Sequence, residues 1–447
     1  MKFPTRHLLT ALLSSLVVVG AVPGQAAPPG NVNWNEKIEV ASGGGHRGPW
    51  RMNESDYDYV DDPTVAINEQ GSIAVAWADQ SRKDIFVQIY EKGNEKRFEA
   101  PVNVSRSPQT FSWLPRLLYG SKSAGEVYLL WQEIIFSGGS HGGEIFFARS
   151  IDGGKSFSEP FNLSNSMAGD GKGRLTRERW DNGSLDLATG PEGNLYAGWT
   201  DYEGRLWISR SSDQASFSKP LLIAGSRAEP ARGPSLAVGP RGVVHIAWTV
   251  GEDPAADIHL ASSTDAGRSF GRPKVALRSD GHSDAPKIAV DNRGTLHLVH
   301  AESPAGPSGQ YHIRYSRMHD GEQEFESPRE ISGPHAQQFD SVSFPALSLG
   351  RENVYVIWEI FPSRRGRPQG VGFAHSRDGG RSFGLAMMVP GSLEPVSGFN
   401  GSQQGLFMKK LATNPAGALA FVNSTFKRNQ FSRIWLFRGE ARGELKN

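Results

Sequence analysis

Five acidic side chains recur beside the same kind of apolar run, and their spacing could support catalysis. Each run ends in a large residue, and the acidic residue follows two places later, or one place later for the last of them. These candidate catalytic residues are Asp79, Glu133, Asp201, Glu302 and Glu359. Paired carboxylates can act as general acid and general base on a glycosidic bond. The alternative is that they accept hydrogen bonds from backbone N–H groups and cap strand ends.

The polar segment from Gly43 to Asp62 supplies a second group of candidates. Aromatic, imidazole and guanidinium groups on one loop suit the recognition of sugars or carboxylates, by stacking and bidentate hydrogen bonding. The candidate ligand-binding residues here are His46, Arg47, Trp50, Arg51 and Asp62. The alternative is that this segment only fills a channel.

Further arginines give a third group of candidate ligand-binding residues. They are Arg116, Arg177 and Arg179, and Trp180 accompanies the last of these. Arginine that converges on one site favours an anionic ligand such as a uronate or a sialate, and a solvated charged loop is the alternative. The chain has no cysteine, and its histidines show no metal-ligand spacing, so no metal and no cofactor are expected.

The elements that must position these residues are short repeated strands. A turn residue is followed six places later by a large residue, with β-branched or aromatic filling, in seven copies such as "GSIAVAW", "GEVYLLW" and "GVVHIAW". Each run suits a strand buried on both faces. One strand precedes each run and two follow it. Four short antiparallel strands that recur in this way are typical of a propeller blade.

The sequence therefore predicts an all-β fold, a seven-bladed β-propeller, with six blades as the alternative. One domain is expected over residues 27–447, with repeats near 62–105, 111–165, 179–225, 232–277, 282–332, 338–392 and 400–440, plus a closing strand at 34–42. The last repeat lacks its fourth strand, and "WNEKIEVAS" aligns with the fourth strand "FEAPVNVS". We expect this N-terminal segment to pair in the last blade and close the ring.

A polar octapeptide returns three times at equal intervals between the third and fourth strands. It reads "SIDGGKSF" at 150–157, "STDAGRSF" at 263–270 and "SRDGGRSF" at 376–383. Its Asp and Ser side chains can bond to nearby N–H groups, its glycines can adopt positive φ, and its Phe can pack into the sheet. The octapeptide is thus predicted to be a structural turn.

This pattern, S-x-D-x-G-x-[ST]-[FW], is the Asp box, and the mature chain resembles the sialidase, or BNR-repeat, superfamily of β-propellers. The resemblance implies a site on the rim opposite the Asp boxes, over the central channel. In sialidases it also implies an arginine triad, an Asp acid/base and a Tyr nucleophile assisted by Glu. Here the repeats number seven instead of the usual six, and no Arg-Ile-Pro string occurs, since Pro115 precedes Arg116.

Composition and the N-terminus bound the location and the partners. With 48 basic and 47 acidic residues the net charge is +1, which gives no reason to expect a nucleic acid or an anionic membrane as partner. Residues 1–26 have a basic start, an apolar core and small residues at their end, as in a secretory signal peptide that is removed. The protein is expected to be secreted, to the periplasm or the medium, with no membrane anchor.

The sequence favours an exported propeller that binds a carbohydrate or another polar, anionic ligand on the rim opposite the Asp boxes, without catalysis. The alternative is an enzyme that acts on an acidic glycan, either a sialidase-like glycoside hydrolase or a polysaccharide lyase. A protein partner in an assembly is the third possibility.

Overall fold

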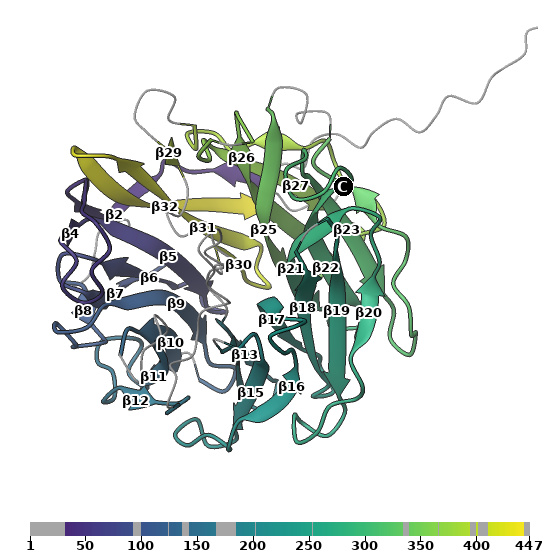
Figure 1. The fold of residues 1–447 in the computed structure, drawn as a ribbon, viewed down its shortest axis with the longest axis horizontal. Helices are drawn as coiled ribbons and strands as arrows, with labels where there is room; N and C mark the ends of the chain where they lie inside the picture. The colour runs from purple at the N-terminus through teal and green to yellow at the C-terminus, as the bar shows by residue number, and fades with distance from the viewer. Residues whose placement is uncertain are drawn as a thin grey trace, which may run out of the picture.

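The computed structural model describes residues 32–92, 100–123, 125–135, 143–166, 185–201, 203–252, 254–333, 339–364, 366–393, 399–400 and 410–441. Throughout these ranges every regular element is a β-strand. The sheets follow one another around a central axis (Figure 1). No helix of the described ranges is long and apolar enough to cross a bilayer. The predicted signal segment, residues 1–26, lies outside these ranges.

Three antiparallel sheets of four strands come first. The first contains β5 (Val60–Ile67), β6 (Ile73–Asp79), β7 (Asp84–Tyr90) and β8 (Val102–Asn103). The second contains β9 (Ser112–Tyr119), β10 (Val127–Glu133), β11 (Glu144–Ser150) and β12 (Phe161–Asn162). The third contains β13 (Leu185–Thr189), β14 (Leu195–Thr200), β15 (Leu206–Ser211) and β16 (Leu221–Ala224). Each set of four consecutive strands is called a blade below.

The next two blades share one sheet, because a single parallel bridge joins Ala256 to His282. The first of them contains β17 (Ala231–Val238), β18 (Val244–Gly251), β19 (Ala256–Ser263) and β20 (Lys274–Leu277). The second contains β21 (His282–Val290), β22 (Leu296–Ser303), β23 (His312–Met318) and β24 (Arg329–Glu330). A separate sheet follows, with β25 (Ser341–Leu349), β26 (Val354–Phe361), β27 (Val371–Ser376) and β28 (Met387–Met388).

The last sheet combines the two ends of the described chain. Its C-terminal strands are β29 (Phe399–Asn400), β30 (Leu411–Thr413), β31 (Ala418–Lys427) and β32 (Phe431–Ala441). Its N-terminal strands, β1 (Val32–Trp34) and β2 (Ile38–Gly43), both pair with β32. The pairing of β2 confirms the prediction that the N-terminal segment supplies the missing outer strand. A small hairpin, β3 (His46–Arg47) with β4 (Tyr57–Asp58), leads into β5.

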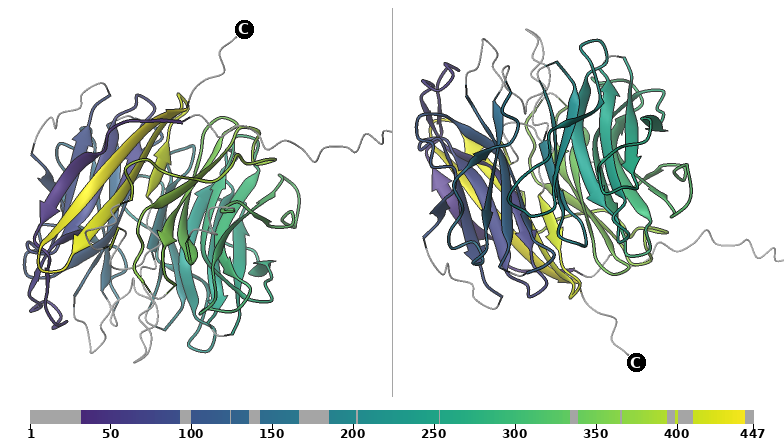
Figure 2. Two further views of the ribbon diagram at one scale, coloured as in Figure 1. Left: turned by 90° about the horizontal axis from the view of Figure 1, so that it is seen from above. Right: turned by 90° about the horizontal axis from the view of Figure 1, so that it is seen from below.

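The first strand of every blade lies at the centre of the ring. A central channel with a volume of about 360 Å³ is lined by residues of β5, β9, β13, β17, β21, β25 and β30. Figure 2 shows the strands crossing the thickness of the ring between two rims of loops. Sheets arranged radially around a channel define a β-propeller. Apolar clusters between neighbouring sheets form its core, as predicted from runs buried on both faces.

The three octapeptides form the same hydrogen-bonded turn. In the first, Ser150 Oγ accepts from Gly154 N at 2.9 Å, and Asp152 Oδ1 accepts from Lys155 N and Ser156 N at 3.0 Å. Gly153 and Gly154 have φ of 78° and 90°, a region in which glycine has no Cβ penalty. The turns at 263–270 and 376–383 repeat these bonds. The predicted structural role of the octapeptide is confirmed.

Strand β2 should be required for stability, because it closes the ring. Val40 is 1% exposed and packs against Val60, Ile434 and Leu436. We expect Val40→Ala to lower the free energy of unfolding by about 2 kcal/mol, measured by urea denaturation. Glu39→Ala, on the exposed face of the same strand, should change it by less than about 0.5 kcal/mol. Equal small effects would contradict a structural role for β2.

The octapeptide turns should weaken in acid. Burial acts to raise the pKa of Asp152, but hydrogen bonds from Ser156 and Ser150 outweigh it and lower the pKa to about 2. Aspartate in the unfolded chain has a pKa of about 3.9, so the unfolded state takes up protons first. The stability that this turn contributes is therefore present above about pH 4 and lost as the pH falls through about 2. Urea denaturation between pH 6 and pH 3 should show a smaller loss for Asp152→Asn than for the intact protein.

Candidate functional site

The rim opposite the octapeptide turns is where the first strands begin, and the channel end at this rim is called the channel mouth below. Five first strands carry a residue with positive φ directly before a proline. These residues are Asp62, Leu114, Gly233, Ala285 and Phe344, with φ between 53° and 59°. Four of them have a Cβ, so the conformation costs about 1–3 kcal/mol each. Strain of this kind clusters at functional sites, so it indicates a candidate site at the channel mouth.

The positive-φ residues interrupt the ladders between first and second strands. The register shifts between Asp61 and Thr64, and again between Arg232 and Ser235 and between Asp284 and Lys287. Leu114, Ala285 and Phe344 contribute to one apolar cluster near the mouth. The sequence contains a signal for these bulges, a proline in each of the five first strands, but only the shared φ shows that the five positions are equivalent.

One register position, which follows the bulge in the five strands that have one, is occupied by six residue types in the seven first strands. Its seven occupants are Thr64, Arg116, Asp186, Ser235, Lys287, Ala346 and Lys410, and all are buried. Asp186 Oδ2 accepts from Leu236 N at 2.8 Å, and Ser235 Oγ accepts from Ile288 N at 3.1 Å. A small acceptor at this position therefore joins one blade to the next. Arginine and lysine have no acceptor atom and cannot make this bond.

Arg116 is fully buried within the wall of the ring. Burial lowers the pKa of Arg116 to about 10, and the carboxylates of Asp186 and Asp62 act in the opposite direction. The guanidinium therefore stays charged at neutral pH. Its Nη1 donates to the carbonyls of Leu114 and Pro115 at 3.2 and 3.1 Å, which fixes it against the bulge of its own strand.

Other charged groups near the mouth connect neighbouring blades. Arg232 lies 3.9 Å from Asp284, which also accepts a 2.9 Å hydrogen bond from Thr249 Oγ1. Lys410 forms a buried ion pair with Glu359 on the preceding blade. These pairs bring opposite charges together at the junctions of the first strands. Burying them carries a large desolvation cost, which a wall of aliphatic residues would avoid.

A tyrosine and a histidine meet at the same rim. Tyr311 Oη lies 2.9 Å from His282 Nδ1, and the two rings pack edge to face at 5.9 Å. His282 begins the first strand β21, and Asp284 is two residues further along it. Two groups that can transfer protons thus lie beside the Arg232–Asp284 pair. This pair was not predicted, because nothing in the sequence spacing of His282 and Tyr311 indicates contact.

The loop from Gly43 to Asp62 packs its aromatic residues against the second blade. The Trp50 ring centroid lies 5.2 Å from that of Trp113 and 6.3 Å from those of Tyr57 and Phe111. His46 and Arg51 are exposed, and His46 lies 3.3 Å from Asp56. The loop therefore has an aromatic base and a polar outer face. The predicted binding residues Arg177, Arg179 and Trp180 lie outside the described residues.

The predicted catalytic carboxylates all bond to other groups of the protein, and two of them, Asp79 and Asp201, are held in a turn of their own blade. Asp79 Oδ1 accepts from Ser81 N and Oγ at 3.1 and 2.8 Å. Asp201 accepts from Arg205 N, Arg205 Nε and Trp207 Nε1 at 2.9, 2.6 and 3.0 Å. These are the contacts expected of carboxylates that cap strand ends, which was the alternative interpretation.

The remaining three carboxylates are also engaged. Glu133 accepts from Ser112 Oγ at 2.7 Å and from Trp131 Nε1 at 2.9 Å; burial raises its pKa, and these hydrogen bonds oppose the rise. Glu302 accepts from Ser279 Oγ and Arg314 Nε, both at 2.8 Å. Glu359, on the second strand β26, is the one of the five that forms an ion pair with Lys410 at the first strand of the next blade.

Comparisons with known proteins agree with the fold. No family model matches the chain, and no curated protein matches it. Among solved structures it is similar to the polysaccharide lyase Uly1, with a TM-score of 0.55 and 13% identity over 91% of this chain and 99% of that one. It is also similar to a protein of unknown function from Dyadobacter fermentans, with a TM-score of 0.51 and 14% identity over 76% and 99% of the two chains.

A third similar structure is a Hadza microbial sialidase, with a TM-score of 0.45 and 14% identity over 75% of this chain and 66% of that one. At these identities the first two likenesses establish the fold. The chain has the β-propeller fold, which its repeated strands and octapeptide turns had indicated.

Asp201 should matter for stability and not for binding. Replacing its carboxylate in Asp201→Asn weakens bonds to Arg205 and Trp207, and we expect the free energy of unfolding to fall by about 1–2 kcal/mol. Glu203→Gln in the same turn, whose carboxylate pairs with Arg227 at the surface, should change it by less than about 0.5 kcal/mol. Chemical denaturation measures both. An Asp201→Asn protein of unchanged stability that has lost glycan binding would return this carboxylate to a functional role.

Proposed function

We propose that the protein is an exported, seven-bladed β-propeller that binds an anionic glycan at the channel mouth without catalysis. The count of seven blades is supported by the seven first strands that line one channel. Export is supported by the signal-like segment at residues 1–26.

One observation carries the proposal: three cations occupy a register position at which other blades hold small residues. Where the position serves only to join blades, it holds a short acceptor, as in Ser235. Arg116, Lys287 and Lys410 cannot accept that backbone hydrogen bond, although Lys410 joins two blades through its ion pair with Glu359, and each adds a buried charge to the wall. Cations retained at such a cost, next to a ring of strained bulges, favour a site for carboxylate or sulfate groups.

The class of ligand follows from the charge and from the loop above the site. A carbohydrate is supported by the fold shared with a polysaccharide lyase. The polar face of the loop would extend the site through His46, Arg47 and Arg51, with Trp50 as its aromatic base. On the channel side, Asp62 and Arg116 are the other proposed ligand-binding residues. Arg177, Arg179 and Trp180 remain predicted contacts of the ligand.

A second candidate is a polysaccharide lyase that acts on the same class of ligand. The observation that favours it is the 2.9 Å contact between His282 and Tyr311 beside Arg232. Elimination from a uronate needs a base for the proton next to the carboxylate, an acid for the leaving oxygen and a cation for the carboxylate. Incubation with uronic-acid polymers, followed by ultraviolet absorbance of unsaturated products, distinguishes the two candidates. Turnover that is lost in Tyr311→Phe would replace the binding proposal.

Lys287 should contribute directly to affinity. It is 7% exposed, and Lys287→Met keeps its length while removing the charge. We expect a polyuronate to bind at least about tenfold more weakly to this variant, which corresponds to about 1.4 kcal/mol, by isothermal titration calorimetry.

The matched control is Thr64→Ser at the same register of another first strand, which carries no charge in either form. It should leave the affinity for the polyuronate unchanged. Equal affinity of the intact protein, Lys287→Met and Thr64→Ser would place the ligand away from the channel mouth.

A further inference from the structure

The wedges between neighbouring blades on the octapeptide rim are filled in a repeated way. In three blades an aromatic residue on the second strand pairs across the ladder with an arginine on the third. The pairs are Tyr128 with Arg149, Tyr196 with Arg210, and His297 with Arg317. The two side chains occupy the space beneath the turn of the next blade.

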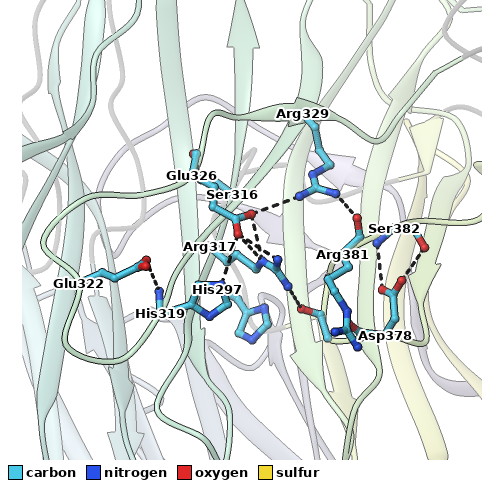
Figure 3. A network of polar contacts seen from close by, with 12 residues as sticks. His297, Ser316, Arg317, His319, Glu322, Glu326, Arg329, Asp378, Arg381 and Ser382 are labelled. Atoms are coloured by element: carbon cyan, nitrogen blue, oxygen red, sulfur yellow. Dashed lines mark hydrogen bonds and ion pairs between the residues drawn. The ribbon is translucent and has the colours of Figure 1, made fainter.

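The arginine also binds that turn. Arg317 Nη1 donates to the carbonyl of Gly379 at 3.0 Å, and Arg149 Nη1 reaches the carbonyl of Asp213 at 3.4 Å. Figure 3 shows Arg317 between Glu326 and the turn that carries Asp378, with Arg329 beside it. Where the aromatic–arginine pair is present, the wedge contains protein side chains.

Four blades lack the full pair, and in two of them a cavity lies at the same place; the other two have Tyr355 opposite His375 and Ala420 opposite Arg438. The first blade has Ala74 opposite Ile89, and a cavity of about 180 Å³ lies between it and the next turn. The blade from β17 to β20 has His245 opposite Ser262, and its cavity has a volume of about 260 Å³. The first blade lacks both members of the pair, whereas in the blade from β17 to β20 Ser262 replaces only the arginine and His245 remains.

The larger cavity contains a hydrogen-bonding group that the protein does not use. His245 Nδ1 lies 2.8 Å from Ser262 Oγ, whereas no group of the described residues bonds to Nε2. Burial, together with the charge of Lys274, lowers the pKa of His245 to about 4. The imidazole is therefore neutral at ordinary pH. Its Nε2 can donate a hydrogen bond to a hydroxyl group or accept one from it, according to the tautomer.

The charged groups of this cavity already have partners. Arg241 forms an ion pair with Asp320 across the two blades, and Lys274 Nζ donates to the carbonyl of Gln323. The apolar part of the lining includes Leu296 and Met318. A cavity with an apolar surface on one side and neutral polar groups on the other suits a sugar ring. The C–H groups on the face of the ring would pack against the apolar surface, and its hydroxyl groups would bond to the polar side.

We propose that the cavity around His245 and Ser262 is a second ligand site, which takes the ring of a neutral monosaccharide. It lies between two blades on the octapeptide rim, and it would exist whether or not the channel mouth binds an anionic glycan. Its volume of about 260 Å³ limits it to one ring, so a free sugar and the terminal sugar of a chain are its two possible sources.

The test uses the full mature protein and titration with D-glucose, D-galactose, L-rhamnose and their methyl glycosides, with D-glucuronate as the charged comparison. Saturation-transfer NMR should show saturable, millimolar binding of at least one neutral sugar, and weaker binding of glucuronate. Binding of the methyl glycoside as well indicates a terminal sugar, and binding of the free sugar alone indicates a free ligand. Both results support the site.

Two variants make the proposal falsifiable. Ser262→Arg introduces the arginine that four other blades have at this position, so it should fill the cavity, abolish binding and preserve the melting temperature. His245→Phe keeps a ring but removes Nε2, and it should weaken binding at least about tenfold. Glu352→Gln, in an exposed ion pair on the same rim, is the control and should change nothing. Absence of saturable binding to the intact protein, or equal binding to Ser262→Arg, would overturn the site.

Discussion

The pairing of β2 with β32 is the interaction on which the whole ring depends. Ile38 pairs with Leu436 and Ser42 with Arg433, so residues from opposite ends of the chain form one ladder. Each sheet buries both faces against its neighbours, and an open ring would expose one of those faces and an unpaired strand edge. Closure therefore fixes the spacing of all the first strands, and with it the width of the channel and the positions of the charges around it.

Contacts between first strands then explain why the channel mouth can hold unusual residues. Where Asp186 and Ser235 accept backbone N–H bonds from the following blade, the wall is structurally complete with small side chains. The same position in other blades is free to vary, because neighbouring strands are already held by their own ladders and apolar clusters. In two of these blades the position is occupied by a buried charged residue, Arg116 or Lys410. The seven repeats thus allow the occupants of one equivalent position to be compared within a single chain.

The two rims differ in how they are built. On one rim the octapeptide turns and the aromatic–arginine pairs fill the wedges, and two of the four blades without the full pair have a cavity beside them. On the other rim the bulges, ion pairs and the His282–Tyr311 contact surround the channel, and the aromatic base of the loop from Gly43 to Asp62 lies beside them. The first rim offers enclosed spaces between blades, whereas the second offers charged groups around the central axis.

The sequence by itself determined the strands, their order and the closure of the ring, because these depend on local patterns that occur in every repeat. The octapeptide turn is also local: Ser150, Asp152 and Gly154 lie within five residues and bond to one another. The site was not determined in this way. The carboxylate register placed Asp79 and Asp201 correctly at strand ends, but whether they face the channel or their own turn depends on side-chain direction.

Only the tertiary structure decided which residues meet at the mouth. Arg232 and Asp284, like Lys410 and Glu359, belong to different blades, and their contact depends on the angle between sheets that share no local pattern. The cavity beside His245 is a property of two blades at once for the same reason. Periodicity encodes what is repeated within a blade, whereas contacts between blades depend on how the closed ring sets one sheet against the next.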